Sequence, residues 1–87
     1  MKWTTHHRPK TPMDPAYSWE EASIDTSIPG MSIDFLVEKA RRCYLATVVA
    51  AGDQHKIGEY RTERLAKAAC RRKAGRIVDC LKRGIRA

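Results

Sequence analysis

The stretch SIDFLVEKARRCYLATVVAAGDQHKIGEY, residues 32–60, decides the fold of this 87-residue chain. Its apolar residues Ile33, Phe35 and Val37 alternate with polar ones, which is the two-residue period of a half-buried strand. After a short connection at residues 40–42, residues 43–50 form an apolar, β-branched run that predicts a central strand. A turn over residues 52–54 then closes a hairpin, and residues 55–60 are predicted to form another strand.

The segment before this stretch predicts one more strand. Ala22, Ile24, Thr26 and Ile28 alternate with polar residues, and Pro29-Gly30 is a strong turn signal. Two helical alternatives remain open. Ser18 could serve as the N-cap of a short helix, and residues 36–46 could form one helix because Lys, Ala, Arg and Leu favour that state.

The chain after residue 61 predicts a helix. Thr62 is a suitable N-cap, and Glu63 complements the helix dipole in the first turn. Gly84 is expected to end this helix, and a bend near Gly75 would let Lys73 leave an otherwise apolar side. At about 100° per residue, the apolar stripe comprises Leu65, Ala66, Ala69, Cys70, Ala74, Ile77, Cys80 and Leu81.

These elements predict an α+β fold: an antiparallel meander of three or four strands, covered on one face by a C-terminal amphipathic helix. Residues 1–16 contain Pro9, Pro12 and Pro15, so they are expected to form a flexible arm without helix or strand. Residues 17–87 are then a single small domain.

The charge of the chain is concentrated in its last third. The net charge is +7. Residues 1–59 hold seven Lys/Arg and eight Asp/Glu, a net of −1, whereas residues 60–87 hold ten and two, a net of +8. This asymmetry favours an acidic partner, either nucleic acid or an acidic protein surface. The alternative is a solvated helix face that serves solubility alone.

The sequence argues against an enzyme, a metal site and a cofactor. His55 and Asp53 are expected in a solvated turn, and neither a nucleophile elbow nor a Gly-rich phosphate loop occurs. His6-His7 lacks further ligands at a suitable spacing, and the three cysteines form no C-x-x-C pair. No apolar run reaches the ~20 residues of a membrane span, and the first residues lack a signal-like apolar segment. A location in the cytoplasm of a host cell is therefore expected.

Several short motifs carry a resemblance. They are Trp19, Ile33 after Gly30, Tyr44-Leu45-Ala46, and the junction from Gly58 to Cys70. Together they resemble small bacteriophage and prophage accessory proteins of unknown function. The resemblance implies the meander-plus-helix fold and a phage origin.

The last strand–helix junction is also similar to two families that bind nucleic acid. Arg64, Lys67 and Arg71 are similar in placement to the basic cluster of double-stranded-RNA-binding domains, which bridges phosphates across a groove. Glu63 departs from that pattern. Integrase arm-type domains read the major groove with an exposed sheet face. Here that face would carry Asp34, Glu38 and Glu59 in place of the basic and aromatic residues such readout requires.

Two functions follow as hypotheses. In the first, the chain is a nucleic-acid-binding accessory module; its phosphate contacts would come from Arg61, Arg64, Lys67, Arg71, Arg72, Lys82 and Arg83, with Arg41, Arg42, Lys2, Arg8 and Lys10 in support. In the second, it inhibits a host machine, as an anti-CRISPR-like protein does, through a sheet edge and the basic helix. Its interface anchors would then be Tyr17, Trp19 and Tyr44. The oligomeric state stays open.

Overall fold

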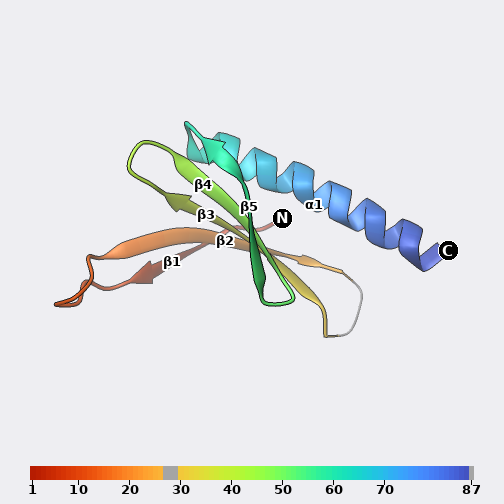
Figure 1. Ribbon diagram of the computed structural model, residues 1–87, viewed down its shortest axis with the longest axis horizontal. Helices are drawn as coiled ribbons and strands as arrows, with labels where there is room; N and C mark the ends of the chain where they lie inside the picture. Colours follow the sequence, from red (N-terminus) through yellow and green to blue (C-terminus); the bar gives the residue numbers. More distant parts are fainter. Residues whose placement is uncertain (27–29, 87) are drawn as a thin grey trace.

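A computed structural model describes residues 1–26 and 30–86. The chain forms one five-stranded antiparallel sheet and one helix, and every strand pairs with its neighbour along the sequence (Figure 1). The elements are β1 (Thr4–Arg8), β2 (Tyr17–Asp25), β3 (Ser32–Lys39), β4 (Tyr44–Ala50), β5 (Asp53–Tyr60) and α1 (Glu63–Arg86). The predicted α+β class and the meander with its covering helix are confirmed, although the sheet has five strands instead of three or four.

The middle of the sheet follows the sequence pattern. Ile33, Phe35 and Val37 are at most 2% exposed on β3, and Phe35 lies directly opposite Val48 of β4. The alternative of one helix over residues 36–46 is wrong, because these residues belong to β3, its turn and β4. Burial of every second side chain on both strands outweighs the weak helix propensity of this segment.

The β4–β5 hairpin is tighter than predicted. Ala51 and Gly52 adopt positive φ angles of 54° and 82°. A two-residue hairpin turn needs such angles at both positions, because only then does its twist match that of the two strands. β5 therefore begins at Asp53, two residues before the expected start. Gly58 lies opposite Ala46, and a Cβ there would approach the Tyr60 hydroxyl to 2.8 Å. Glycine at this position makes room for the Tyr60 ring.

The prediction of a flexible arm without helix or strand over residues 1–16 is wrong for residues 4–8. Residues 4–8 form β1, which pairs with residues 17–21 of β2. The three prolines lie in the connection between the two strands, where a missing N–H breaks no ladder bond. Within this connection, the Thr11 N–H donates to the Asp14 carbonyl at 2.9 Å.

β2 starts earlier than the alternation predicted. It begins at Tyr17, so the alternative helix after Ser18 is wrong. Ala22 and Ile24 lie opposite Phe35 and Ile33, as a strand requires. The predicted positions Ile28 and Pro29 lie outside the described residues. Gly30 adopts a positive φ of 78°, in keeping with the expected turn.

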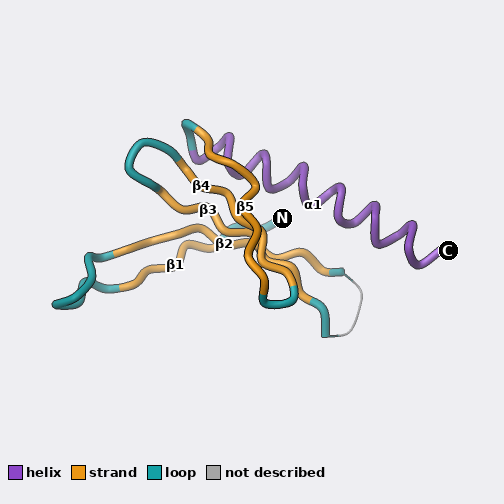
Figure 2. Tube along the Cα trace, in the orientation of Figure 1, coloured by secondary structure: helices purple, strands orange, loops and turns teal. Residues whose placement is uncertain are grey.

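The helix begins where the sequence predicted. The Leu65 N–H donates to the Thr62 hydroxyl at 3.2 Å, and the Ala66 N–H donates to the Thr62 carbonyl at 3.1 Å. α1 lies across one face of the sheet, over β3, β4 and β5 (Figure 2). Small residues allow close approach. The buried side chains of the helix are Ala66, Ala69, Cys70 and Ala74.

Parts of the predicted apolar stripe are wrong. Leu65 is 50% exposed although its neighbour Ala66 is fully buried, and Cys80 is also exposed. At 100° per residue Leu65 lies in line with the exposed Arg72, so it belongs to the side of the helix that faces away from the sheet. Lys73 is exposed without a break in the helix, which runs through Gly75 and ends at Arg86, not Gly84.

Candidate nucleic-acid interface

The side of α1 that faces away from the sheet is strongly basic. Arg64, Arg71, Arg72, Lys82 and Arg83 are all exposed, as the sequence predicted for them. At 100° per residue these cations form two rows along the helix. One row comprises Arg64, Arg71 and Lys82, and the other comprises Arg72, Arg76 and Arg83. From Arg64 to Arg83 the rows extend for about 29 Å.

The charge of this surface is not neutralised by nearby carboxylates. Among the side chains that the structure describes, none of the cations in these two rows has a carboxylate within 4.0 Å. The only acidic residues of α1 are Glu63 and Asp79. Glu63 pairs with Lys67 towards the sheet, so Asp79 is the single acid on the outward side. The two rows therefore produce a positive field along most of the helix.

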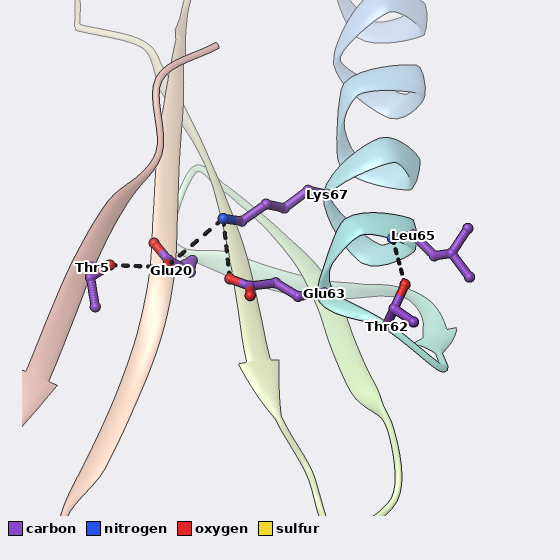
Figure 3. A network of polar contacts seen from close by, with 6 residues as sticks. All are labelled: Thr5, Glu20, Thr62, Glu63, Leu65 and Lys67. Atoms are coloured by element: carbon purple, nitrogen blue, oxygen red, sulfur yellow. Dashed lines mark hydrogen bonds and ion pairs between the residues drawn. The ribbon is translucent and has the colours of Figure 1, made fainter.

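Lys67 differs from the other predicted site residues. Its Nζ lies 3.1 Å from a Glu63 carboxylate oxygen and 3.8 Å from a Glu20 oxygen, and its side chain is 20% exposed (Figure 3). The same ammonium group lies 5.2 Å from the centre of the Trp3 ring. The Thr5 hydroxyl donates to Glu20 at 2.9 Å. Lys67 thus joins α1 to β1 and β2, and it is not available for phosphate.

A second group of cations lies beside the start of the helix. Tyr44 pairs with Tyr60, so the β3–β4 turn and the end of β5 lie at one end of the sheet (Figure 1). Arg41 and Arg42 are exposed in this turn, and Arg61 is exposed between β5 and α1. The structure therefore brings Arg41 and Arg42 to the helix end that also carries Arg61 and Arg64.

The three predicted aromatic anchors do not form one surface. Tyr44 packs against the core on the helix side of the sheet. Tyr17 and Trp19 lie on the other side, where their rings stack at a centroid distance of 5.6 Å. Burial, followed by a hydrogen bond to Glu38 and the charge of that carboxylate, raises the pKa of Tyr17 to about 12. Tyr17 is therefore neutral at physiological pH.

Sequence reasoning missed two cations. Arg76 is exposed one turn after Arg72, and Lys73 is exposed between the two rows and the sheet. The 3.6-residue period that placed Arg72 on the outside would also have found Arg76. The supporting cations Lys2, Arg8 and Lys10 are exposed, but they belong to β1 or its flanks at the opposite edge of the sheet from β5.

Other kinds of site find little support in the described part of the chain. No group of three or more His, Cys, Asp or Glu side chains could hold a metal ion there. His55 and Asp53 are exposed, but they lie at the start of β5 and not in the predicted turn. Burial raises the pKa of the Cys70 thiol to about 11, which makes it a poor nucleophile. Within residues 1–26 and 30–86, no helix combines the length and apolar character needed to cross a membrane.

Comparisons of this chain with protein-family models, with curated proteins and with solved structures found no match.

Proposed function

We propose that the outward side of α1 binds the phosphate backbone of nucleic acid without sequence preference. The observation that carries this proposal is the pair of exposed cation rows, about 29 Å long and without carboxylate partners among the described side chains. Duplex DNA carries one negative charge per about 1.7 Å of its axis, so a helix of this length meets many phosphates.

The residue types favour phosphate as the ligand. Five of the six side chains in the two rows are arginines, and a guanidinium binds phosphate oxygens through two parallel hydrogen bonds. Contacts of this kind position a protein on nucleic acid and carry no base information. The open side of the sheet carries Asp34, Glu38 and Glu59, so base readout by that surface is disfavoured.

The test is a titration of a fluorescently labelled 20-base-pair DNA duplex of mixed sequence, followed by anisotropy between 50 and 300 mM salt. We expect log Kd to rise steeply with log salt, because bound phosphates release counterions. The triple variant Arg71→Gln, Arg72→Gln, Arg76→Gln should lower this slope by about 2 to 3, at about 0.9 per lost contact. Glutamine keeps the helix propensity of arginine.

The control variant is Lys2→Gln, Lys10→Gln, Lys56→Gln, which removes the same net charge from exposed positions outside α1. It should leave the slope nearly unchanged. Equal losses in the two triple variants would mean that net charge alone attracts the duplex. A slope below about 1 for the parent protein would reject the proposal and favour docking of α1 into an acidic groove of a host protein.

A further inference from the structure

Within residues 1–26 and 30–86, no element covers the second face of the sheet. α1 lies on the side of Phe35, and directly opposed residues of antiparallel strands share a face. The strand register therefore defines the other side, here termed the open face. Its residues are Thr4, His6 and Arg8 of β1, Tyr17, Trp19, Glu21 and Ser23 of β2, Ser32, Asp34, Leu36 and Glu38 of β3, Leu45, Thr47 and Val49 of β4, and Gln54, Lys56 and Glu59 of β5.

The centre of the open face is apolar and aromatic. Leu36, Leu45 and Val49 are half-buried on this face, which is opposite to the side on which α1 lies. Trp19 lies between two other rings: His6 stacks on it at 5.6 Å with an interplanar angle of 12°, and Tyr17 stacks at 5.6 Å with 30°. An apolar patch with a polar rim is typical of a protein-binding surface.

Carboxylates lie among and around these apolar residues: Glu38 lies opposite Trp19 and Leu45, and Asp34 lies opposite Ser23 and Val49. The open face carries four carboxylates and only two permanent cations. The carboxylates belong to Glu21, Asp34, Glu38 and Glu59, and the cations are Arg8 and Lys56. Lys56 is already paired with Glu59 at 2.7 Å. Among the described side chains, Asp34 and Glu38 have no cation within 4.0 Å. These two carboxylates lie on one strand, about 13 Å apart along β3.

One contact within the chain indicates which cation the aromatic rings accept. The guanidinium carbon of Arg8 lies 5.3 Å from the centre of the Tyr17 ring, and the Glu38 carboxylate on the neighbouring strand helps to raise the pKa of the same tyrosine. Guanidinium groups stack on aromatic faces and bind carboxylates through two bonds, whereas a lysine ammonium is a compact, strongly hydrated charge. The open face thus combines the two groups that arginine recognises.

We propose that the open face binds an arginine-rich segment of another protein. Arginine side chains of this segment pair with Asp34 and Glu38, and the aliphatic parts of the segment cover Leu36 and Leu45. This surface lies on the opposite side of the sheet from α1, so it is separate from the proposed phosphate site. Nucleic acid is not its occupant, because the carboxylates repel phosphate.

A second copy of the chain is a less suitable occupant than another protein. Among the described residues its most arginine-rich surface is α1, so the contact would join two different surfaces and would build a ring or an open chain of molecules. Each copy also carries a net charge of +7, which opposes self-association.

The test uses the full chain without nucleic acid and a fluorescently labelled octa-arginine peptide at 50 mM salt. We expect saturable binding by anisotropy, and binding of octa-lysine about tenfold weaker. The variant Asp34→Asn, Glu38→Gln should weaken octa-arginine binding about tenfold. The matched variant Asp53→Asn, Asp79→Asn makes the same charge change at exposed positions off the open face and should alter binding less than twofold. Circular dichroism checks that both variants fold.

Each contrary outcome overturns the proposal. Equal weakening in the two double variants would mean that net charge alone attracts the peptide. Equal affinity for octa-arginine and octa-lysine would mean that the open face does not distinguish a guanidinium from an ammonium group. Self-association in sedimentation at 50 mM salt, abolished by Asp34→Asn, Glu38→Gln while the peptide does not bind, would assign the open face to a second copy. A failure of the DNA titration leaves this test unaffected, since α1 is not part of the peptide site.

Discussion

The two faces of β3 share one backbone and differ in what lies over them. On the face under α1, Ile33, Phe35 and Val37 are at most 2% exposed. On the open face, Asp34, Leu36 and Glu38 are only half-buried. A single helix over β3, β4 and β5 therefore makes one face the core and leaves the other available for binding.

The covered face is also unevenly built. Phe35, Ile33 and Cys70 are its largest fully buried side chains, and the helix contributes mainly alanines. Small residues bring α1 close to the sheet, but they supply little apolar area of their own. The stability of the domain therefore depends on a few large side chains from the strands.

The largest expected effect on stability comes from shortening one side chain on each face of β3. Phe35→Ala should lower the free energy of unfolding by about 4 kcal/mol, because it leaves a cavity in the core. Leu36→Ala, on the open face, should cost about 1 kcal/mol. Urea denaturation measures both. If Phe35→Ala does not fold, Phe35→Leu at about 1 to 2 kcal/mol provides the comparison. Equal costs for residues 35 and 36 would contradict the difference between the faces.

A second comparison uses the two cysteines of α1. Burial raises the pKa of Cys70 to about 11, two units above its usual value, so its thiolate is about a hundredfold scarcer at neutral pH. Cys80 is exposed. We expect a thiol reagent at pH 7.5 to modify Cys80 at least about a hundredfold faster than Cys70 in the folded protein. The Cys80→Ser variant isolates the slow reaction, and similar rates for the two thiols would show that α1 detaches readily.

A substitution at Gly75 measures how helix propensity on the solvent side of α1 affects stability. A Cβ at this position would meet no atom within 4 Å, and the residue is exposed in a continuous helix. Gly75→Ala should therefore raise the free energy of unfolding by about 0.8 kcal/mol, the difference in helix propensity. Thermal denaturation gives the shift in Tm. A loss of stability would mean that the helix needs flexibility at this point.

The last expected effect is the pH dependence contributed by Tyr17 on the open face. Its pKa is about 12 in the folded protein and about 10 when unfolded. The folded state therefore retains a proton that the unfolded state loses, and stability falls as pH rises from about 10 towards 12. Cys70 acts in the same direction, so the measurement compares the parent with Tyr17→Phe between pH 8 and 11. The parent should lose more stability over this range.

The elements best predicted from the sequence are those whose pattern is set locally. The alternation at residues 33–37, the apolar run at 43–50 and the Thr62 cap each depend on a few neighbouring residues, and the structure confirms them. β1 was missed because the prolines dominated the prediction for residues 1–16. Those prolines lie after Arg8, in the connection that allows β1 to return beside β2.

The candidate site was predicted less well than the fold. Helical periodicity indicated which side of α1 is outward, but the predicted apolar stripe was too wide around the helix, so Leu65 and Cys80 were misplaced. Lys67 was assigned to phosphate binding although Glu63, four residues earlier, is its nearer partner. The Glu20 carboxylate and the Trp3 ring, which hold Lys67 against the sheet, are 47 and 64 residues earlier in the sequence. Contacts of this kind depend on the tertiary arrangement, which a single sequence does not display.

The order of the elements along the chain has a consequence for synthesis. Each strand pairs with the one before it, so the meander can assemble as it leaves the ribosome. Its apolar side, completed when β5 ends at Tyr60, is covered only after residues 63–86 have been made. At typical rates of translation, synthesis from Tyr60 to Arg86 takes roughly 1 to 5 s. During that interval the nascent sheet presents Phe35 and Val48 to the cell, and mutations that delay docking of α1 will increase aggregation more than their effect on stability suggests.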